Sequence, residues 1–162
     1  MAVWPPPAVA DRVASLDRPE MRDIRWTTRQ QWHVTLRFLG DVADPERSDL
    51  DAALAAVAAS AAPAPVTVGP ATRILGQALL ILPAGGLDRL AAGVHAATGA
   101  GERPFVGHMT LARARRKARV PARLGGSPLE AAWTATEMVL ARSRLDAAGA
   151  VYEPVARYRL GG

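Results

Sequence analysis

The sequence predicts an α+β fold built on antiparallel sheets. Helical and strand patterns follow one another in the order helix, strands, helix, strands, helix, strands, and short hairpin turns are the commonest link between strands. Such links favour antiparallel sheets over doubly wound parallel sheets, whose strands need helical crossovers. A four-residue pattern that begins with histidine also occurs once in each half of the chain, so we expect two related halves within one domain spanning residues 1–162.

The first half is expected to contain two helices and two strands. Prolines 5–7 can open a helix that runs to about Asp17, and Asp44 followed by Pro45 is a typical N-cap and first turn for a second helix, which ends near Ala61. Apolar residues that recur at helical spacing support both helices. Runs of apolar and β-branched residues predict strands at residues 24–28 and 32–39.

The second half is expected to be richer in strands. The pattern predicts strands at residues 66–68, 73–75 and 78–82, a helix at 87–98, and further strands at 105–113, 132–144 and 151–160. The last two strands would turn at residues 147–149. The basic stretch 113–123 indicates a loop or a short helix, which either follows an RNA backbone or is simply solvated.

Composition excludes several kinds of chemistry. The 162 residues include no cysteine, which rules out disulfides, a thiol nucleophile and thiolate metal sites, and only three histidines, which leave little room for a histidine-rich metal cage. The phosphate loops GxGxxG and GxxxxGK(S/T) and the motifs GxSxG and HExxH are absent. We therefore expect no metal and no cofactor.

Charge and hydropathy give weaker indications. The net charge is +5, and all but one of the 20 basic residues are arginine, a bias that fits either a GC-rich coding sequence or a surface that attracts polyanions. No segment approaches the roughly 20 apolar residues of a membrane span. The first residues also lack the pattern of a signal peptide. We expect a cytoplasmic monomer with no membrane contact.

The repeated pattern is His33-Val34-Thr35-Leu36 and His108-Met109-Thr110-Leu111, with the two copies 75 positions apart. Because side chains alternate along a strand, the histidine and threonine of each copy share one face and the apolar residues share the other. Two related halves would place both pairs across one cleft. A single pair of this kind is commonplace in strands, but two copies use two of the three histidines, which favours a functional site.

These residue types suit one kind of reaction. Two imidazoles can act as base and acid near neutral pH. Two hydroxyls and a guanidinium can hold the oxygens of a phosphoryl group. A two-metal phosphatase would need several clustered carboxylates, which the sequence lacks. The pattern therefore indicates phosphoester hydrolysis without a metal.

On these residues the chain resembles the two-histidine (2H) phosphoesterase superfamily. Within it, the chain is most similar to the bacterial and archaeal RNA 2′,3′-cyclic phosphodiesterases, historically called 2′-5′ RNA ligases. The resemblance also includes Ser143 and Tyr152-Glu153 in a C-terminal hairpin over residues 140–160. The main matching stretches are Arg25-Trp26, Trp32-His33-Val34-Thr35-Leu36-Arg37-Phe38-Leu39-Gly40-Asp41-Val42, Pro104-Phe105 and His108-Met109-Thr110-Leu111-Ala112-Arg113.

The resemblance implies a bilobal, pseudo-twofold fold, with two antiparallel sheets, helices on the outside and a central cleft that carries both motifs. His33 would be the proton donor to the leaving 3′-oxygen and His108 the base that activates water. Thr35 and Thr110 would bind the phosphate. The substrates would be RNA ends that carry a 2′,3′-cyclic phosphate, tRNA-derived ends among them, and the product a 2′-phosphate. The sequence by itself does not distinguish the two histidines.

Three more residues are candidates for the site. The family uses an arginine matching Arg113 at the phosphate, but Arg113 lies five residues after His108 and needs a bulge or the strand end to reach that face. Arg37 shares the parity of His33 and is either a second phosphate contact or an exposed solubilising residue. Phe38 has core parity, although the family suggests an aromatic that stacks on a terminal base. We expect His95, on a helix, to be structural or exposed.

Two departures from the family pattern and two other functions stay open. Only Ala2-Val3-Trp4 precede Pro5, where the family has a longer strand, and Val106-Gly107 stand where it has a bulkier or basic pair. One alternative function is an RNA-binding or 2′-5′ RNA-joining protein. The other is a phosphodiesterase for a small cyclic nucleotide.

Overall fold

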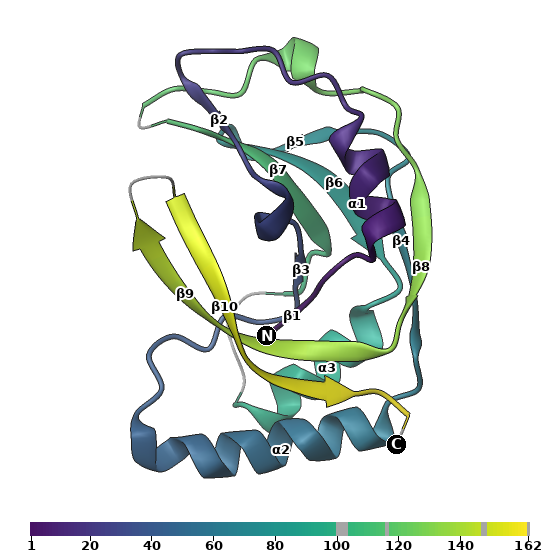
Figure 1. The fold of residues 1–162 in the computed structure, drawn as a ribbon, viewed down its shortest axis with the longest axis vertical. Helices are drawn as coiled ribbons and strands as arrows, with labels where there is room; N and C mark the ends of the chain where they lie inside the picture. The colour runs from purple at the N-terminus through teal and green to yellow at the C-terminus, as the bar shows by residue number, and fades with distance from the viewer. Residues whose placement is uncertain (100–103, 116, 147–148, 162) are drawn as a thin grey trace.

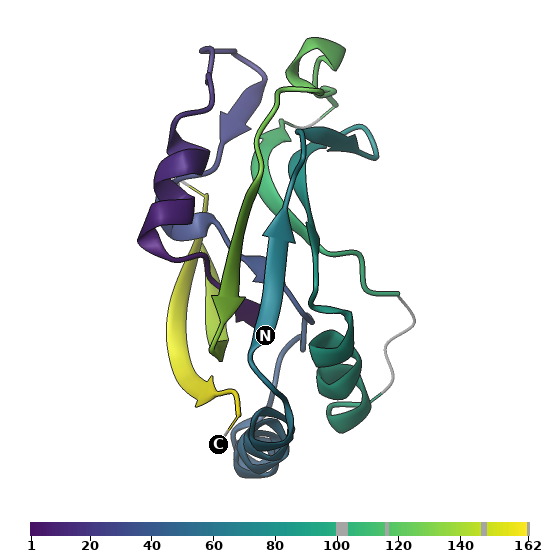
Figure 2. The same cartoon turned by 90° about the vertical axis from the view of Figure 1, so that its right-hand side faces the viewer.

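The computed structural model describes residues 1–99, 104–115, 117–146 and 149–161, and it has the predicted α+β architecture (Figures 1 and 2). The α-helices of these ranges are α1 (Pro7–Ala14), α2 (Arg47–Ser60) and α3 (Asp88–Ala97). Their strands are β1 (Ala2–Val3), β2 (Ile24–Trp26), β3 (Val34–Thr35), β4 (Ala64–Val68), β5 (Arg73–Leu75), β6 (Leu79–Gly85), β7 (His108–Ala114), β8 (Ala131–Ala135), β9 (Glu137–Asp146) and β10 (Gly149–Arg159). Short 3-10 helices lie at Arg29–Gln31, Asp44–Glu46 and Ala122–Leu124.

The strands form a curled antiparallel sheet. Its hydrogen-bonded order is β10-β9-β1-β3-β7-β6-β4-β8, while β2 pairs with β7 and β5 with β6. The two sheets expected from the sequence are therefore joined, because β6 pairs with β7 over one part of its length and with β4 near its end. Figure 1 shows how the sheet curls, with the β9–β10 hairpin on one side of the molecule and β4 and β8 on the other.

The centre of this order contains the two halves' matching strands. β3 and β7 are the fourth and fifth strands of eight, and their antiparallel register sets Val34 opposite Met109. Both residues are fully buried. They stand between the histidine and the threonine of the two repeated motifs, so the motifs are related by a local twofold axis between these strands, as the pseudo-twofold prediction requires.

The helices cover the ends and one edge of the sheet. α2 packs against α3 and β10, and α1 lies beside β8 (Figures 1 and 2). The predicted apolar stripe of α2 faces the core, with Leu54 fully buried and Leu50 and Val57 partly buried. The core they share with the sheet lies on the other side from the histidine face of β3 and β7, which lines a cavity.

Several predicted boundaries were wrong. The expected strand 32–39 is paired only over Val34–Thr35, because the amides of Leu36 and Arg37 both donate to the Met1 carbonyl, at 2.9 and 3.2 Å, and the regular ladder ends there. The second helix opens with a 3-10 turn at Asp44–Glu46, so the α-helix begins at Arg47 and not at Pro45.

Two of the later strands also differ from the prediction. The expected strand 132–144 is divided at Thr136 into β8, which pairs with β4, and β9, which pairs with β10 and β1. The strand expected from residue 105 begins at His108. Residues 147–148 of the last predicted turn, together with Arg116 of the basic stretch, lie outside the described residues.

Candidate active site

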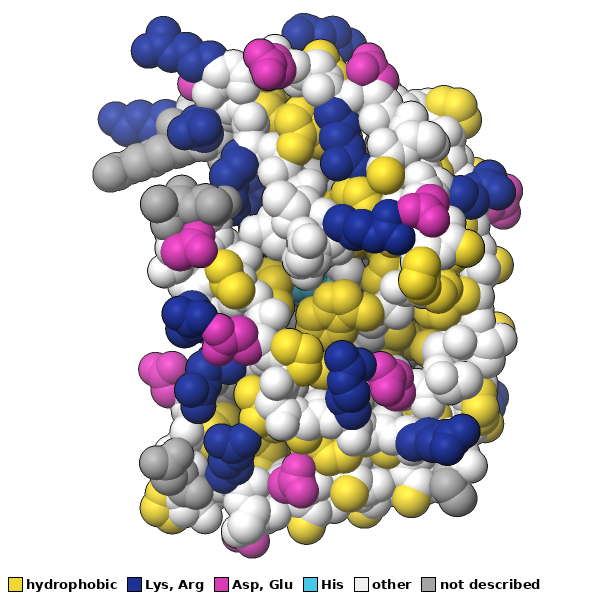
Figure 3. Space-filling view, viewed as in Figure 1, with side chains coloured by type: hydrophobic (Ala, Val, Ile, Leu, Met, Phe, Trp, Pro, Cys, Tyr) yellow, Lys and Arg dark blue, Asp and Glu magenta, His cyan; other side chains and the backbone are white. Residues whose placement is uncertain are grey.

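A cavity of about 340 Å³ brings together most of the predicted site residues. Its walls include both histidines, both threonines and Arg113, and also Arg25, Gln31, Phe38, Leu75 and Tyr152. In the space-filling view, histidine is visible at the centre of the face, between hydrophobic side chains, with arginine or lysine around it (Figure 3). The structure therefore gathers two imidazoles, two hydroxyls and guanidinium groups at one opening.

The sheet register determines how the two motifs meet. With Val34 opposite Met109, the antiparallel register carries His33 alongside Thr110 and Thr35 alongside His108. The side chains of Val34 and Met109 point into the core, so those of their neighbours point to the other face. Each histidine is thus next to the threonine of the other motif, and the two imidazoles lie diagonally across the cavity floor.

His108 is oriented by its own backbone neighbourhood. Its Nδ1 lies 2.7 Å from the carbonyl oxygen of Val106. A carbonyl only accepts hydrogen bonds, so Nδ1 carries the hydrogen, and in the neutral ring Nε2 carries the lone pair. Gly107 permits this turn, because a Cβ there would lie 2.2 Å from the carbonyl oxygen of Ala84. The glycine in the Val106-Gly107 departure therefore has a structural explanation.

His33 lies in a more apolar environment. Its ring centroid is 5.0 Å from that of Trp4 and, edge to face, 4.4 Å from that of Tyr152. Its buried Nδ1 has no partner in full hydrogen-bond geometry among the described residues, although the backbone of Gln31 is close enough to favour the charged ring. Burial, helped by nearby positive charges such as Arg113 and opposed by the backbone of Gln31, lowers the pKa of His33 to about 4. At neutral pH and with the cleft empty, His33 is uncharged.

A β-bulge brings Arg113 to the histidine face. Between β6 and β7, Leu80 pairs with Ala112 but the next residue, Ile81, pairs with Thr110, so Leu111 is an extra residue in β7. Alternation stops there, since Leu111 and Ala112 are both buried. Beyond the bulge Arg113 shares the face of His108 and Thr110, which is how it comes to line the cavity.

Arg37 is not brought to the pair of histidines. One nitrogen of its guanidinium donates to the carbonyls of His95, at 3.1 Å, and Gly99. In return, Nε2 of His95 donates to the carbonyl of Leu36 at 3.1 Å. The hydrogen bonds of Arg37 and His95 therefore connect the end of α3 to the segment that follows β3. His95 has a structural role here, one of the two possibilities expected from the sequence. Arg37 lines only the neighbouring cavity.

That neighbouring cavity is larger, about 600 Å³, and shares His33, Thr35, Phe38 and Tyr152 with the first. Phe38 stands at the boundary between the two, with 78% of its surface exposed. Its position in the alternating pattern does not bury it, because the regular strand has already ended at Thr35. Besides Arg37, the basic side chains that line the larger cavity are Arg47, Arg142 and Arg144.

No role was predicted from the sequence for several residues that line the two cavities. Thr27 is one of them, and four others are Trp4, Arg25, Gln31 and Tyr152. Arg25 is the cross-strand partner of Arg113, and the Nε2 of Gln31 donates to the carbonyl of Ala150 at 2.6 Å. All four come from segments outside the two motifs. Arg25 and Tyr152 could have been predicted as site residues, since both belong to stretches that resemble the family.

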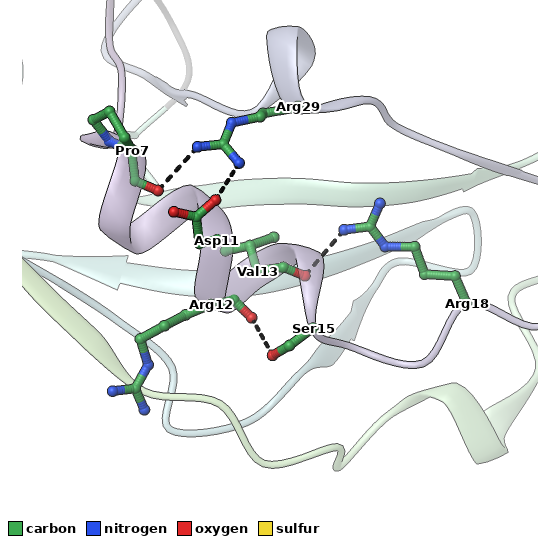
Figure 4. A network of polar contacts seen from close by, with 7 residues as sticks. All are labelled: Pro7, Asp11, Arg12, Val13, Ser15, Arg18 and Arg29. Atoms are coloured by element: carbon green, nitrogen blue, oxygen red, sulfur yellow. Dashed lines mark hydrogen bonds and ion pairs between the residues drawn. The ribbon is translucent and has the colours of Figure 1, made fainter.

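The segment that leads to His33 is anchored to α1 (Figure 4). Arg29, in the 3-10 helix, forms an ion pair with Asp11 and donates to the carbonyl of Pro7 at 3.1 Å. Arg18 donates to the carbonyl of Val13 at 3.0 Å, and its guanidinium lies 4.6 Å from the centroid of the Trp32 ring. These contacts fix the backbone that enters the first motif.

The described residues contain no group of three or more histidine, aspartate and glutamate side chains that could hold a metal ion. None of the described helices is both long and apolar enough to cross a membrane.

Beyond Arg113, the described residues of the stretch 113–123 do not line either cavity.

Comparison with known proteins gives a family and a fold. Residues 3–72 match the family model described as LigT like Phosphoesterase. No curated protein sequence matches the chain. Among solved structures, TT0787 of Thermus thermophilus is 28% identical with a TM-score of 0.84, and the match covers 99% of this chain and 96% of that one.

Escherichia coli LigT is similar in the same way. Its complex with 3′-AMP is 24% identical, with a TM-score of 0.74 and coverage of 99% of this chain and 96% of that one. Its complex with NADP⁺ gives a TM-score of 0.75 at the same identity and coverage. The resemblance drawn from the two motifs is thus confirmed: residues 3–72 match the LigT-like phosphoesterases of the two-histidine superfamily, and the chain has their fold over nearly its whole length.

Proposed function

We propose that the protein hydrolyses RNA 2′,3′-cyclic phosphate ends to 2′-phosphate ends, without a metal and with His33 and His108 as proton donor and acceptor. The observation that carries the proposal is the pairing of the two motifs, Val34 opposite Met109, around one cavity. The family match indicates a phosphoesterase, and the two histidines, two threonines and Arg113 at the cavity support this reaction within that class.

The chemistry needs an acid and a base on opposite sides of one phosphorus atom. In the proposed reaction a water oxygen attacks phosphorus, and Nε2 of His108, whose lone pair is left free by the bond from Nδ1 to Val106, takes the proton of that water. The bond from phosphorus to the 3′-oxygen breaks, and His33 gives that oxygen a proton. The product keeps phosphate on the 2′-oxygen, and solvent resets both imidazoles.

His33 has to be charged before it can act as the acid. Burial keeps it neutral in the empty cleft, but a bound phosphodiester brings a negative charge beside the ring and favours the imidazolium. Thr35, Thr110 and Arg113 line the same cavity and can hold the non-bridging oxygens. Binding of the substrate would thus itself charge the acid.

The space around the proposed phosphate position offers contacts for the rest of a nucleotide. The exposed ring of Phe38 stands between the two cavities and offers a face on which a terminal base can stack. The larger cavity, with Arg47 and Arg142 on its wall, has room and charge for the nucleotides upstream. Structures of E. coli LigT with 3′-AMP and NADP⁺ support a nucleotide ligand.

The experiment is a hydrolysis assay in EDTA with oligoribonucleotides of increasing length that end in a 2′,3′-cyclic phosphate, beginning with the mononucleotide. The proposal expects a 2′-phosphate as the only product and a kcat/KM that rises with length. A 3′-phosphate product, or no turnover in EDTA, contradicts it. Turnover without any gain from length identifies a small cyclic nucleotide as the substrate.

A further inference from the structure

Thr27, just after β2, is a buried polar residue that none of the proposed chemistry uses. It is 7% exposed, and with Thr72 it makes up the buried polar side chains of the described residues. Its hydroxyl lies 2.9 Å from the carbonyl oxygen of Thr110 and 2.8 Å from that of Leu111. Its backbone amide also donates to the Leu111 carbonyl at 2.8 Å.

These two carbonyls belong to the bulge. Along a regular strand, successive carbonyls point to opposite sides, so one hydroxyl cannot reach two in a row. The hydroxyl of Thr27 reaches both because Leu111 is the extra residue in β7. The contact therefore exists only in the bulged form of the strand.

The hydroxyl is held in place from its other side. The indole Nε1 of Trp32 donates to the Thr27 oxygen at 3.0 Å, and Trp32 is almost completely buried. A hydroxyl has one hydrogen to donate, and because the indole is only a donor, that hydrogen must go to the carbonyls. The buried indole N–H of Trp32 thus has its acceptor only when a hydroxyl stands at position 27, and that hydroxyl meets both carbonyls only when the bulge is present.

We infer that Thr27 is a positioning residue for Arg113: its hydroxyl stabilises the bulge at Leu111, which turns the Arg113 side chain onto the face of His108 and Thr110. Without the bulge, strict alternation places Arg113 on the opposite face, away from the phosphate. The role of Arg113 in catalysis rests on the proposed function, whereas the bulge itself does not.

The test compares Thr27→Val, which keeps the shape and removes the hydroxyl, with Thr27→Ser, which keeps the hydroxyl. Thr72→Val is the matched control, because the hydroxyl of Thr72 also bonds a backbone carbonyl, that of Leu124 at 2.8 Å, but outside both cavities. We expect Thr27→Val to lower kcat for a 2′,3′-cyclic-phosphate oligonucleotide by about 10- to 100-fold, the range for a misplaced catalytic group. Thr27→Ser and Thr72→Val should stay within about threefold of the wild type, although Thr72→Val also loses stability.

A double variant separates positioning from general damage. In an Arg113→Ala background, adding Thr27→Val should cost less than about twofold in kcat, because the group it positions is already gone. An equal loss in both backgrounds overturns the inference, and so does a Thr27→Val enzyme with normal kcat. If Thr27→Val does not fold, Thr27→Cys replaces it, since a thiol is a much weaker donor of similar size.

A binding measurement keeps this test independent of the proposed function. Inorganic phosphate should raise the Tm of the wild type, and the rise should shrink to a similar extent in Thr27→Val and Arg113→Ala but not in Thr27→Ser or Thr72→Val. If the wild type hydrolyses no cyclic phosphate but shows this pattern, the proposed function fails and the inference about Thr27 stands. If Thr27→Val keeps the full rise while Arg113→Ala loses it, the inference fails.

Discussion

Val34 and Met109 lie directly opposite each other in the centre of the sheet, and both are fully buried. Each is the middle residue of a His-x-Thr motif, so this one pair fixes the register in which the two motifs meet. A slip by one residue would turn one motif's histidine and threonine into the core. The geometry of the site is therefore set by core packing beneath it.

The burial of His33 predicts a pH-dependent stability. Its pKa is near 6.5 in the unfolded chain and about 4 in the folded protein, so between these values only the unfolded chain binds the proton. The part of the free energy of unfolding that depends on neutral His33 is fully present above pH 6.5 and is lost as the pH falls toward 4. At pH 5 the loss is about 2 kcal/mol. Urea unfolding at pH 7 and pH 5 measures this.

The control for that measurement is His33→Gln, which removes the titrating group. The difference between the two free energies of unfolding should be smaller in the variant by about the same 2 kcal/mol. Other carboxylates and imidazoles titrate equally in both proteins, so they cancel. An identical pH dependence in wild type and variant would show that His33 is not buried as described.

Anion binding should charge His33. Sulfate keeps its charge between pH 5 and 7, and at the phosphate position it would raise the pKa of the neighbouring imidazole. We expect calorimetry at pH 6 in buffers of different ionisation enthalpy to show proton uptake, larger in the wild type than in His33→Gln by several tenths of a proton. Equal uptake in the two proteins would contradict substrate-induced charging of the acid.

Phe38 should contribute to binding and not to folding. Because its side chain is 78% exposed, Phe38→Ala should leave the free energy of unfolding unchanged. If the ring stacks on a terminal base, the same change weakens binding of a 2′-phosphate oligonucleotide by about 1–3 kcal/mol, while Phe38→Tyr retains it. Urea unfolding and fluorescence titration measure the two effects, and unaltered affinity in Phe38→Ala would exclude stacking.

Arg113 and Arg37 should differ in what they support. Arg113→Ala should reduce kcat/KM for the cyclic phosphate by about 100-fold, as for loss of one group that stabilises developing charge. Arg37→Ala removes the donor to the carbonyls of His95 and Gly99, so its larger effect should be on the free energy of unfolding, about 1–3 kcal/mol. A larger loss of kcat/KM in Arg37→Ala than in Arg113→Ala would reverse this assignment.

The parts of the site that the sequence predicts are those set by local periodicity. His33 and Thr35, like His108 and Thr110, are two residues apart, so the period of a strand alone puts them on one face. Arg113 breaks that period, and only the pairing of Leu80 and Ile81 with β7 shows the bulge that corrects it. A bulge depends on a neighbouring strand and on Thr27, which local pattern does not reveal.

The remaining differences also have non-local causes. Phe38 and Arg37 leave the strand pattern because the Met1 carbonyl takes the amides of Leu36 and Arg37 and ends the ladder. The environment of His33 is made by Trp4 and Tyr152, which come from opposite ends of the chain. Family resemblance supplied the roles of the residues in the motifs, but not these contacts.

The central claim is that His33 and His108 are the acid and the base of one metal-independent reaction. The direct measurement is the pH dependence of kcat/KM for a 2′,3′-cyclic-phosphate oligonucleotide in EDTA, for the wild type, His33→Ala and His108→Ala. We predict a bell-shaped profile in the wild type, and in each variant a loss of about 10²- to 10⁴-fold together with one limb of the bell. Wild-type turnover in either variant would contradict it.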